Sequence, residues 1–321
     1  MRLLVIPDIH NRTVLAQSIM ENVPHDRCVL LGDYFDNFHD TPDHANNTAV
    51  WLRDFVLPNP KNIPLVGNHD VNYFWNFHPQ FRCSGYTDAK NHAIHKELSQ
   101  DHFDRFKFFH IEDGWCYSHA GLTTAMWKSM SLAYEQTHEE TRAQFFERVF
   151  TDWVRKSVED ISLIRNVPLL GCGWDRGGSQ QHGGIIWVDW SNFASIQGVN
   201  QIVGHTPHKI PEVHVQFAGG GYKKKYISDY LKNIETYSGY DVVSLNFALD
   251  THSNHYAIVT DGKVEVYDAA TREPILHPAN EARVIYELPP DCPGLDAMVA
   301  DEISAANGKR KWTQVDPKDL T

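Results

Sequence analysis

Short apolar runs, each ending in a polar cluster, constrain the fold of this chain more than any other feature of its sequence. Helical patterns separate the first three runs, and a helix between two strands implies parallel neighbours with the helix on a face of their sheet. The expected strands are Arg2–Pro7, Arg27–Gly32, Asn62–Gly67, Trp115–His119 and Gln201–Gly204, and the expected helices are Thr13–Val23 and Ala45–Leu57. The sequence therefore predicts an α/β fold.

The second half of the chain has a different pattern, in which short runs typical of strands follow one another. Asp261-Gly262 lies between two alternating runs and predicts a hairpin. Residues from about Leu132 to Arg165 are mainly helical in pattern, and the tail from about Ala270 is polar and rich in proline. The expected strands are Glu212–Ala218, Val242–Asn246, Tyr256–Thr260 and Lys263–Tyr267.

Charge and hydropathy exclude several classes of protein. The chain has 29 Lys and Arg against 41 Asp and Glu, a formal net charge of −12, which argues against a broad nucleic-acid surface. The N-terminal apolar run, Leu3–Ile6, stops at Pro7-Asp8, too early for a secretory signal, and no run approaches the ~20 residues of a membrane span. Five cysteines, an odd number without a Cys-x-x-Cys pair, favour a reduced, cytoplasmic protein.

The polar clusters that end the five strands are the candidate functional residues. Each one alone has an ordinary interpretation as a turn, a helix cap or a structural histidine. Ligands of α/β sheets bind at the carboxyl ends of strands, so the clusters are expected to converge on one edge. Asp8 and His10, two apart in an extended segment, would point to the same side. The clusters are Asp8-Ile9-His10, Gly32-Asp33-Tyr34-Phe35-Asp36, Gly67-Asn68-His69-Asp70, His119-Ala120-Gly121 and Gly204-His205-Thr206-Pro207.

This order of motifs resembles the calcineurin-like metallophosphoesterases, which include the phosphoprotein phosphatases and the symmetric diadenosine tetraphosphatases. The resemblance covers roughly residues 1–260, and Ser118–Leu122 and Val203–Pro207 are most similar to the phosphatase branch. It implies a four-layer αββα sandwich, with two mixed β-sheets flanked by helices. It further implies a domain of residues 1–270, with insertions at about 71–110 and 122–184, and a C-terminal extension of residues 271–321.

The resemblance also implies two divalent metal ions. A carboxylate can bridge two cations where an imidazole cannot, and the mixed oxygen and nitrogen ligands suit manganese first, then iron, zinc, cobalt or nickel. The resemblance assigns Asp8 and His10 to the first metal, Asp33 to the bridge, and Asn68, His119 and His205 to the second metal.

The implied reaction is direct attack on phosphorus by a hydroxide that bridges the metals. The resemblance makes His69 the general acid and Asp36 the residue that orients it, and the pair predicts a bell-shaped pH profile. The expected enzyme is a phosphomonoesterase of protein phosphatase type acting on a phosphorylated small molecule or phosphoprotein. Two alternatives stay open: a phosphodiesterase or nucleotide pyrophosphatase, and a metal-free protein-binding scaffold on the same fold.

The chain departs from the family pattern at several positions. Asn37 stands where phosphatases carry a phosphate-binding arginine, and Asn11 stands where glycine is common, although Asn also tolerates the left-handed backbone region. His208 is one place late for the Gly-His-x-His pattern of nuclease relatives. Arg176, in the glycine-rich segment 171–178, is the first candidate for phosphate binding and Arg12 the second; the alternative for Arg176 is a solvated loop residue.

Two further segments allow a functional and a structural interpretation. The aromatic residues Tyr73, Phe74, Trp75, Phe77 and Phe81 could form a lid or stacking surface, but such density favours core packing. The basic run Tyr222–Tyr226 could dock an anionic partner, but a solvated loop is favoured.

Overall fold

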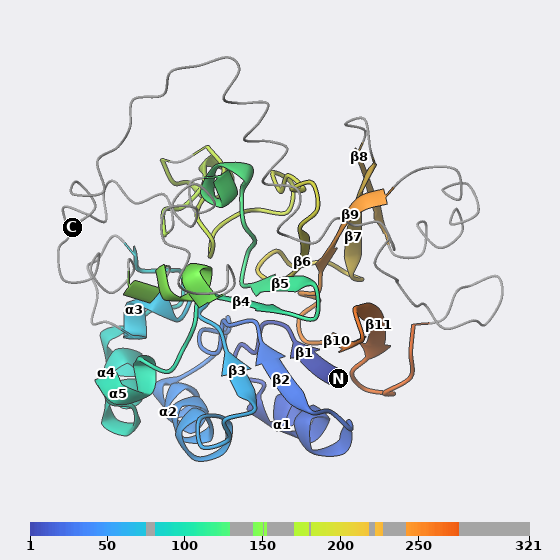
Figure 1. Cartoon of the computed structure of the whole chain (residues 1–321). Coiled ribbons are helices and arrows are strands. Elements are labelled where there is room, and N and C mark those ends of the chain that lie inside the picture. Colours follow the sequence, from blue (N-terminus) through green and yellow to red (C-terminus); the bar gives the residue numbers. More distant parts are fainter. Residues whose placement is uncertain are drawn as a thin grey trace.

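Two mixed β-sheets pack face to face in the computed structural model, with helices on their outer faces (Figure 1). The structure describes residues 1–74, 81–128, 144–149, 151–152, 170–179, 181–217, 222–226 and 242–275. Together with the sheet orders, this arrangement confirms the four-layer αββα sandwich predicted from the sequence.

The first sheet has the strand order β11-β10-β1-β2-β3. Strands β1, β2 and β3 are parallel, and β10 runs antiparallel to both β1 and β11. Asp261 and Gly262 join β10 to β11, both with positive φ (50° and 78°), as a two-residue hairpin turn requires. The strands are β1 (Arg2–Ile6), β2 (Arg27–Leu30), β3 (Asn62–Pro64), β10 (His255–Thr260) and β11 (Lys263–Asp268).

The second sheet has the order β4-β5-β6-β9-β7-β8. Strands β5, β6 and β9 are parallel and the other neighbours are antiparallel, so this sheet too is mixed. The strands are β4 (Phe109–Glu112), β5 (Trp115–Ser118), β6 (Asn200–Val203), β7 (Glu212–Phe217), β8 (Tyr222–Tyr226) and β9 (Val242–Ala248).

Strand β1 is apolar at nearly every position because both of its faces are covered. Leu3 and Val5 belong to the core between the two sheets, which also contains Trp115 of β5. Leu4 and Ile6 point the other way, into the core beneath helices α1 (Thr13–Asn22) and α2 (Pro42–Trp51). On the outer face of the second sheet, Phe146 packs against Trp127 and Phe109, with ring centroids 5.1 and 6.4 Å apart.

Among the described residues, three helices follow β3, two of them only one turn long. Helix α3 (Val71–Phe74) comes directly after the polar cluster that ends β3, and α4 (Asp88–Glu97) and α5 (Gln100–Phe103) follow it. Tyr73, Phe74 and Phe81 are buried, which confirms the core interpretation of those three aromatics.

Two sequence expectations need correction, and one strand was not expected. Helix α2 begins at Pro42 rather than Ala45, because Thr41 and His44 form a capping box with proline in the first turn, and a π-helical segment (Leu52–Val56) replaces its expected end. The basic run Tyr222–Tyr226 is strand β8, paired with β7, and not a solvated loop. Strand β4, which the pattern did not indicate, pairs antiparallel with β5.

Other expectations fall wholly or partly outside the described residues. These are Trp75 and Phe77, most of the helical stretch from Leu132 to Arg165, and the extension beyond residue 275. The division into a domain of residues 1–270 with insertions at about 71–110 and 122–184 stays a prediction. Within the part of the chain that the structure describes, every helix is too short or too polar to cross a bilayer.

Candidate metal centre

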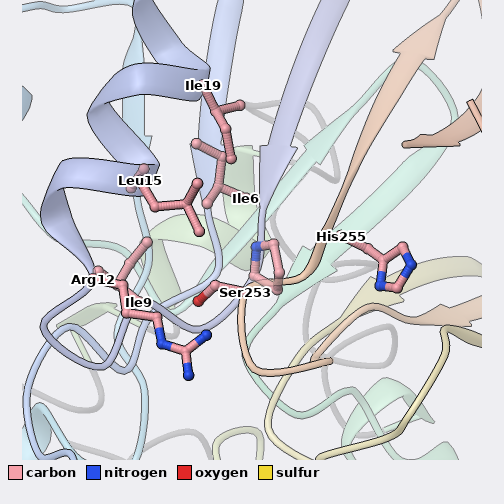
Figure 2. Close-up of a pocket in the computed structure, with 9 residues that line it drawn as sticks. Ile6, Ile9, Arg12, Leu15, Ile19, Ser253 and His255 are labelled. Carbon is pink, nitrogen blue, oxygen red and sulfur yellow. The ribbon is translucent and has the colours of Figure 1, made fainter. Parts of the chain in front are cut away.

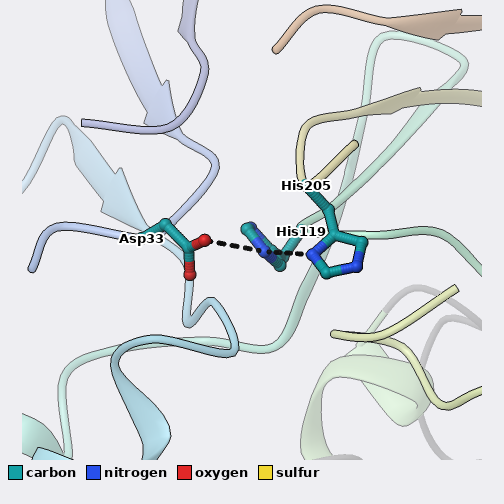
Figure 3. Close-up of side chains that lie close together, drawn as sticks. All are labelled: Asp33, His119 and His205. Atoms are coloured by element: carbon teal, nitrogen blue, oxygen red, sulfur yellow. Dashed lines mark hydrogen bonds and ion pairs between the residues drawn. The ribbon is translucent and has the colours of Figure 1, made fainter. Parts of the chain in front are cut away.

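The polar clusters that end the strands converge at one edge of the sandwich, where the two sheets meet. Asp33 follows β2 of the first sheet, whereas His119 and His205 follow β5 and β6 of the second (Figure 3). One ligand atom from each of these three residues lies within 4.8 Å of the others, and all three side chains are buried. Residues far apart in the sequence therefore form one compact group.

Asn68 completes this group through its side-chain oxygen. Its Oδ1 lies 2.9 Å from Nε2 of His119 and 2.8 Å from Nδ1 of His205. The two ring nitrogens are 3.2 Å apart, and Asp33 Oδ2 is 3.5 Å from His119 Nε2. Four electron-pair donors thus face a common point, an arrangement that favours a bound cation.

The tautomer of His119 follows from its surroundings. Its Nδ1 lies 2.9 Å from the carbonyl oxygen of Leu31, which can only accept, so Nδ1 carries the proton and the lone pair is on Nε2. Burial lowers the pKa of His119, and burial together with His119 lowers the pKa of His205 well below its ordinary value. Both rings are therefore neutral, which is the form that binds metal.

Asp8 and His10 lie beside this group. Asp8 is fully buried and accepts from the backbone N–H of His205 at 3.0 Å, and its Oδ1 is 3.3 Å from His119 Nδ1. Burial, with Asp250 and Asp33 nearby, raises the pKa of Asp8 well above its ordinary value. A buried carboxylate whose charge is so poorly compensated fits a site that a cation would complete.

His69 and Asp36 form a pair on the open side of the cluster. His69 Nδ1 is 3.3 Å from Asp36 Oδ2, and the His69 ring packs edge-on against His10 with centroids 5.4 Å apart. The His69 side chain is 18% exposed and that of Asp36 only 2%. Burial opposes protonation of His69, but the carboxylates of Asp33 and Asp36 outweigh it and raise its pKa to about 8 in the absence of metal.

The loops that carry these side chains have an unusual backbone. A positive φ is uncommon for residues other than glycine and costs on the order of 1 kcal/mol or more, so it persists only where the surrounding structure imposes it. The structure also confirms that Asn11 adopts the left-handed conformation. Positive φ occurs at His10 (43°), Asn11 (63°), Asp33 (50°), Asp36 (60°) and His205 (69°).

Two glycines allow the carboxylates to approach the backbone. A Cβ at Gly67 would lie 2.1 Å from Oδ1 of Asp33, and one at Gly204 would lie 2.5 Å from Oδ2 of Asp8. Any larger residue would displace a carboxylate. Gly67 and Gly204 thus allow the carboxylates of Asp33 and Asp8 to take their positions in the site.

Asp70 has a role that the sequence did not reveal. Its carboxylate accepts hydrogen bonds from the backbone N–H groups of Asp33 (2.7 Å), Tyr34 (2.8 Å) and Gly67 (2.8 Å). Burial and the nearby Asp33 raise its pKa to about 8, against the effect of these donors. Asp70 therefore ties the loop after β2 to the loop after β3. Its place in the Gly-Asn-His-Asp cluster was the one available signal.

The predicted substrate-binding arginines are engaged elsewhere in this structure. Arg176 Nε donates to Asp189 Oδ2 at 2.8 Å, but Arg176 lies near enough to His205 to affect its titration. Arg12 donates to the carbonyl of His252 and borders a small, mostly apolar pocket beneath α1 that includes Ser253 (Figure 2). Arg12 is therefore the weaker candidate of the two.

His208 does not join the cluster. Its Nδ1 is 3.2 Å from Glu212 Oε1, in a pair on the side of β7. The histidine that stands one place late for the nuclease-like pattern thus has a different partner.

The donor set fits a first-row transition metal. Carboxylate and amide oxygens and imidazole nitrogens converge without a thiolate, which is the mixture that Mn, Fe, Zn or Co accepts. Nε2 of His205 has no hydrogen-bond partner among the described residues. With the Nδ1 lone pair turned toward the cluster, the unpartnered Nε2 carries the proton of the neutral ring.

Comparison with known families agrees with this geometry. A family model described as calcineurin-like phosphoesterase matches residues 1–209. The chain belongs to the calcineurin-like phosphoesterase family, whose members depend on metal ions. Taken with the buried group of Asp33, His119 and His205, this membership defines a phosphoesterase-type hydrolase with a candidate metal centre.

One solved structure supports the fold. The chain is similar to a cold-active protein tyrosine phosphatase, with a TM-score of 0.50 and 13% identity over 88% of this chain and 80% of that one. It is also similar to a metallophosphoesterase from Sphaerobacter thermophilus (TM-score 0.36, 14% identity, 81% and 84% of the two chains). A protein serine/threonine phosphatase from Saccharomyces cerevisiae gives a TM-score of 0.34 at 12% identity over 90% and 80%. No curated protein matches the chain significantly.

Proposed function

We propose that this chain is a dinuclear, metal-dependent phosphomonoesterase of protein phosphatase type. The observation that carries the proposal is the convergence of Asp33, Asn68, His119 and His205 on one point, with the His69–Asp36 pair on the open side. One cation would be held by Asp33, Asn68, His119 and His205, and the other by Asp8, His10 and Asp33.

The cations would supply Lewis acidity to the phosphoryl oxygens and lower the pKa of water held between them. The buried ligands exclude bulk water from one side, so a phosphate ester approaches past His10 and His69. Bound in this way, the ester places its leaving oxygen toward the side where His69 lies.

His69 would then protonate the leaving oxygen from Nε2, since its Nδ1 faces Asp36. Asp36 keeps the ring in this orientation and stabilises its protonated form. Such assistance matters most for esters whose leaving group is a strong base.

The substrate would be a phosphorylated small molecule or phosphoprotein, and Arg176 would bind a phosphate oxygen through its guanidinium. We propose manganese as the metal and a reducing, cytoplasmic setting. Cys28 and Cys116, free thiols buried in strands β2 and β5, agree with that setting.

The test compares phenyl phosphate with diphenyl phosphate, the bis-ester of the same phenol, after addition of Mn²⁺. Faster hydrolysis of the monoester supports the proposal, and Asp36→Asn should lower its turnover by more than about threefold. Preference for the bis-ester or a dinucleoside polyphosphate would make the chain a phosphodiesterase or pyrophosphatase. A negligible metal content with no hydrolysis would indicate a binding scaffold.

A further inference from the structure

Lys90 is a buried lysine in a helix that is otherwise mostly polar. It lies in the first turn of α4, where Thr87 caps the helix by accepting from the Lys90 backbone N–H at 3.2 Å. The residue is only 3% exposed, although lysine is almost never fully buried without partners. Its position therefore calls for a specific set of acceptors.

The Lys90 ammonium has three N–H donors, and each has an acceptor. Nζ is 3.1 Å from Asp36 Oδ1 and 2.7 Å from the carbonyl oxygen of Gly85, and it also contacts Asp40 Oδ1. The side chains of Asp36 and Asp40 are 2% and 5% exposed. One lysine thus pairs with two buried carboxylates of the loop that follows β2.

The contact fixes the orientation of Asp36. Its Oδ1 accepts from Lys90 and from the Tyr73 hydroxyl at 2.8 Å, which leaves Oδ2 to face His69 Nδ1. Gly85 packs so closely that a Cβ there would lie 3.0 Å from the Asp36 Cβ. The carboxylate is held from two directions and cannot rotate freely.

The second carboxylate connects this arrangement to the loop after β1. Asp40 Oδ2 accepts from Asn11 Nδ2 at 2.9 Å, and Asn11 Oδ1 accepts from the Thr48 hydroxyl of α2 at 2.8 Å. Lys90 is therefore the cation at the centre of a buried network. The neighbouring Asn37 supplies no positive charge to it.

We propose that Lys90 is a positioning residue for the His69–Asp36 pair, so that its ammonium holds Asp36 Oδ2 in line with His69 Nδ1. The inference rests on the proposed function, in which His69 protonates the leaving oxygen. It adds a residue from α4, encoded 54 positions after Asp36, that touches neither substrate nor metal.

The test compares Lys90→Met with Lys96→Met, an exposed lysine on the same helix. Three aryl phosphates of decreasing leaving-group basicity serve as substrates: phenyl, 4-nitrophenyl and 2,4-dinitrophenyl phosphate. Lys90→Met should lower kcat about tenfold or more for phenyl phosphate and less than about threefold for the dinitrophenyl ester, with KM little changed. Lys96→Met should match the wild type. An equal loss of kcat on all three esters would overturn the proposal.

A double variant separates positioning from folding. Lys90→Met leaves two buried carboxylates without a cation, and Asp40→Asn removes one of those charges. Asp40→Asn/Lys90→Met should therefore recover thermal stability while keeping the altered leaving-group dependence, since Asp36 Oδ1 still lacks its charged donor and keeps only the Tyr73 hydroxyl. Full recovery of phenyl phosphate turnover in the double variant would contradict the proposal.

A measurement without turnover keeps the two proposals distinct. In a crystal structure of Lys90→Met, Asp36 Oδ2 should lie beyond hydrogen-bond distance of His69 Nδ1; an unchanged pair would refute the positioning role whatever the activity. The loss of kcat in His69→Ala could be the same for all three esters while the crystal structure of Lys90→Met shows Asp36 displaced. In that case the assignment of His69 as the acid fails and the structural role of Lys90 stands.

Discussion

The ring Nδ1 of His10 lies 2.8 Å from the backbone carbonyl oxygen of Asp36. A carbonyl only accepts, so His10 carries its proton on Nδ1 and turns the lone pair of Nε2 toward Asp33 Oδ2, 3.8 Å away. The residue proposed to orient the acid therefore also fixes the tautomer of a proposed metal ligand. The metal ligands and the acid pair share one loop and should respond together when that loop is disturbed.

Divalent metal should stabilise the fold, because its ligands come from both sheets and converge only in the folded chain. At a free Mn²⁺ concentration about a hundredfold above the dissociation constant, we expect a gain of about 2.7 kcal/mol and a rise in Tm of roughly 5 °C or more. Differential scanning calorimetry of metal-stripped protein, with and without added Mn²⁺, measures the rise in Tm. His119→Ala should abolish the rise and His182→Ala, an exposed residue outside the cluster, should keep it. Equal shifts in both variants would argue against the site.

Loss of the acid should slow the reaction without loss of metal. His69→Ala removes the proton donor, so kcat for phenyl phosphate should fall about 10²- to 10⁴-fold. Steady-state kinetics give the loss and elemental analysis the manganese content. The matched control is His92→Ala, an exposed histidine of α4. A fall in metal content parallel to the fall in kcat would show that His69 acts as a ligand instead.

Arg176 should affect substrate binding. Its Nε is paired with Asp189, and its charge is one of the causes that lower the pKa of His205. Arg176→Ala should raise KM, or lower kcat, about tenfold, as expected when a charged hydrogen bond to phosphate is lost. Arg53→Ala removes a comparable surface cation, one that pairs with Asp54 and Glu97, and should leave both constants near the wild-type values. Unchanged constants in Arg176→Ala would make this arginine a structural partner of Asp189 only.

The Glu147 contacts should make stability depend on pH. Burial opposes ionisation of Glu147, but hydrogen bonds from His110 (2.5 Å) and Lys107 (2.7 Å) outweigh it and lower its pKa. A lowered pKa means that the stabilisation is complete above the ordinary value of 4.5 and is lost as pH falls through the lower folded value. Glu147→Gln should lower Tm at neutral pH by about 2–4 °C.

The difference in Tm between Glu147→Gln and the wild type should shrink as pH falls below 4.5, because the carboxyl of the unfolded wild-type chain is protonated first. The stabilisation is lost completely once pH falls below the lower pKa of the folded chain, where the folded carboxyl is protonated too. Thermal melts followed by circular dichroism across this range measure it. Glu21→Gln, on the exposed side of α1, is the control and should show a small difference at every pH. A constant difference from neutral to acid pH would contradict the assigned pKa direction.

Much of the fold was readable because both faces of its central strands are covered. In β1 and β2 the buried run is continuous, and the polar residues that follow mark where each strand leaves the core. Strand β8 was missed because three successive lysines look like a loop, although pairing with β7 fixes them as a strand. The early start of α2 was missed because histidine, at position 44, completes its capping box in place of the usual Glu or Gln.

The residues of the site also fall into those that the sequence could predict and those that it could not. Side chains at strand ends, such as Asp33 and His119, could be predicted because the strands deliver them to one edge. The carboxylates that pair with Lys90, Asp36 and Asp40, lie 54 and 50 positions away. Asp70 likewise reaches the backbone of Asp33 and Tyr34, 37 and 36 positions away. Local pattern carries no trace of such pairings. Both residues stand in polar stretches where a lysine or aspartate is ordinarily solvated.

The left-handed backbone at His10, Asp33, Asp36 and His205 costs folding stability at positions whose side chains are needed for the proposed activity. Replacing any of the four by glycine would relieve the conformation but delete a side chain that is proposed to bind metal or to orient the acid. Selection for heat resistance would therefore have to act elsewhere in the molecule. Protein engineers seeking a hardier variant should leave these four positions alone.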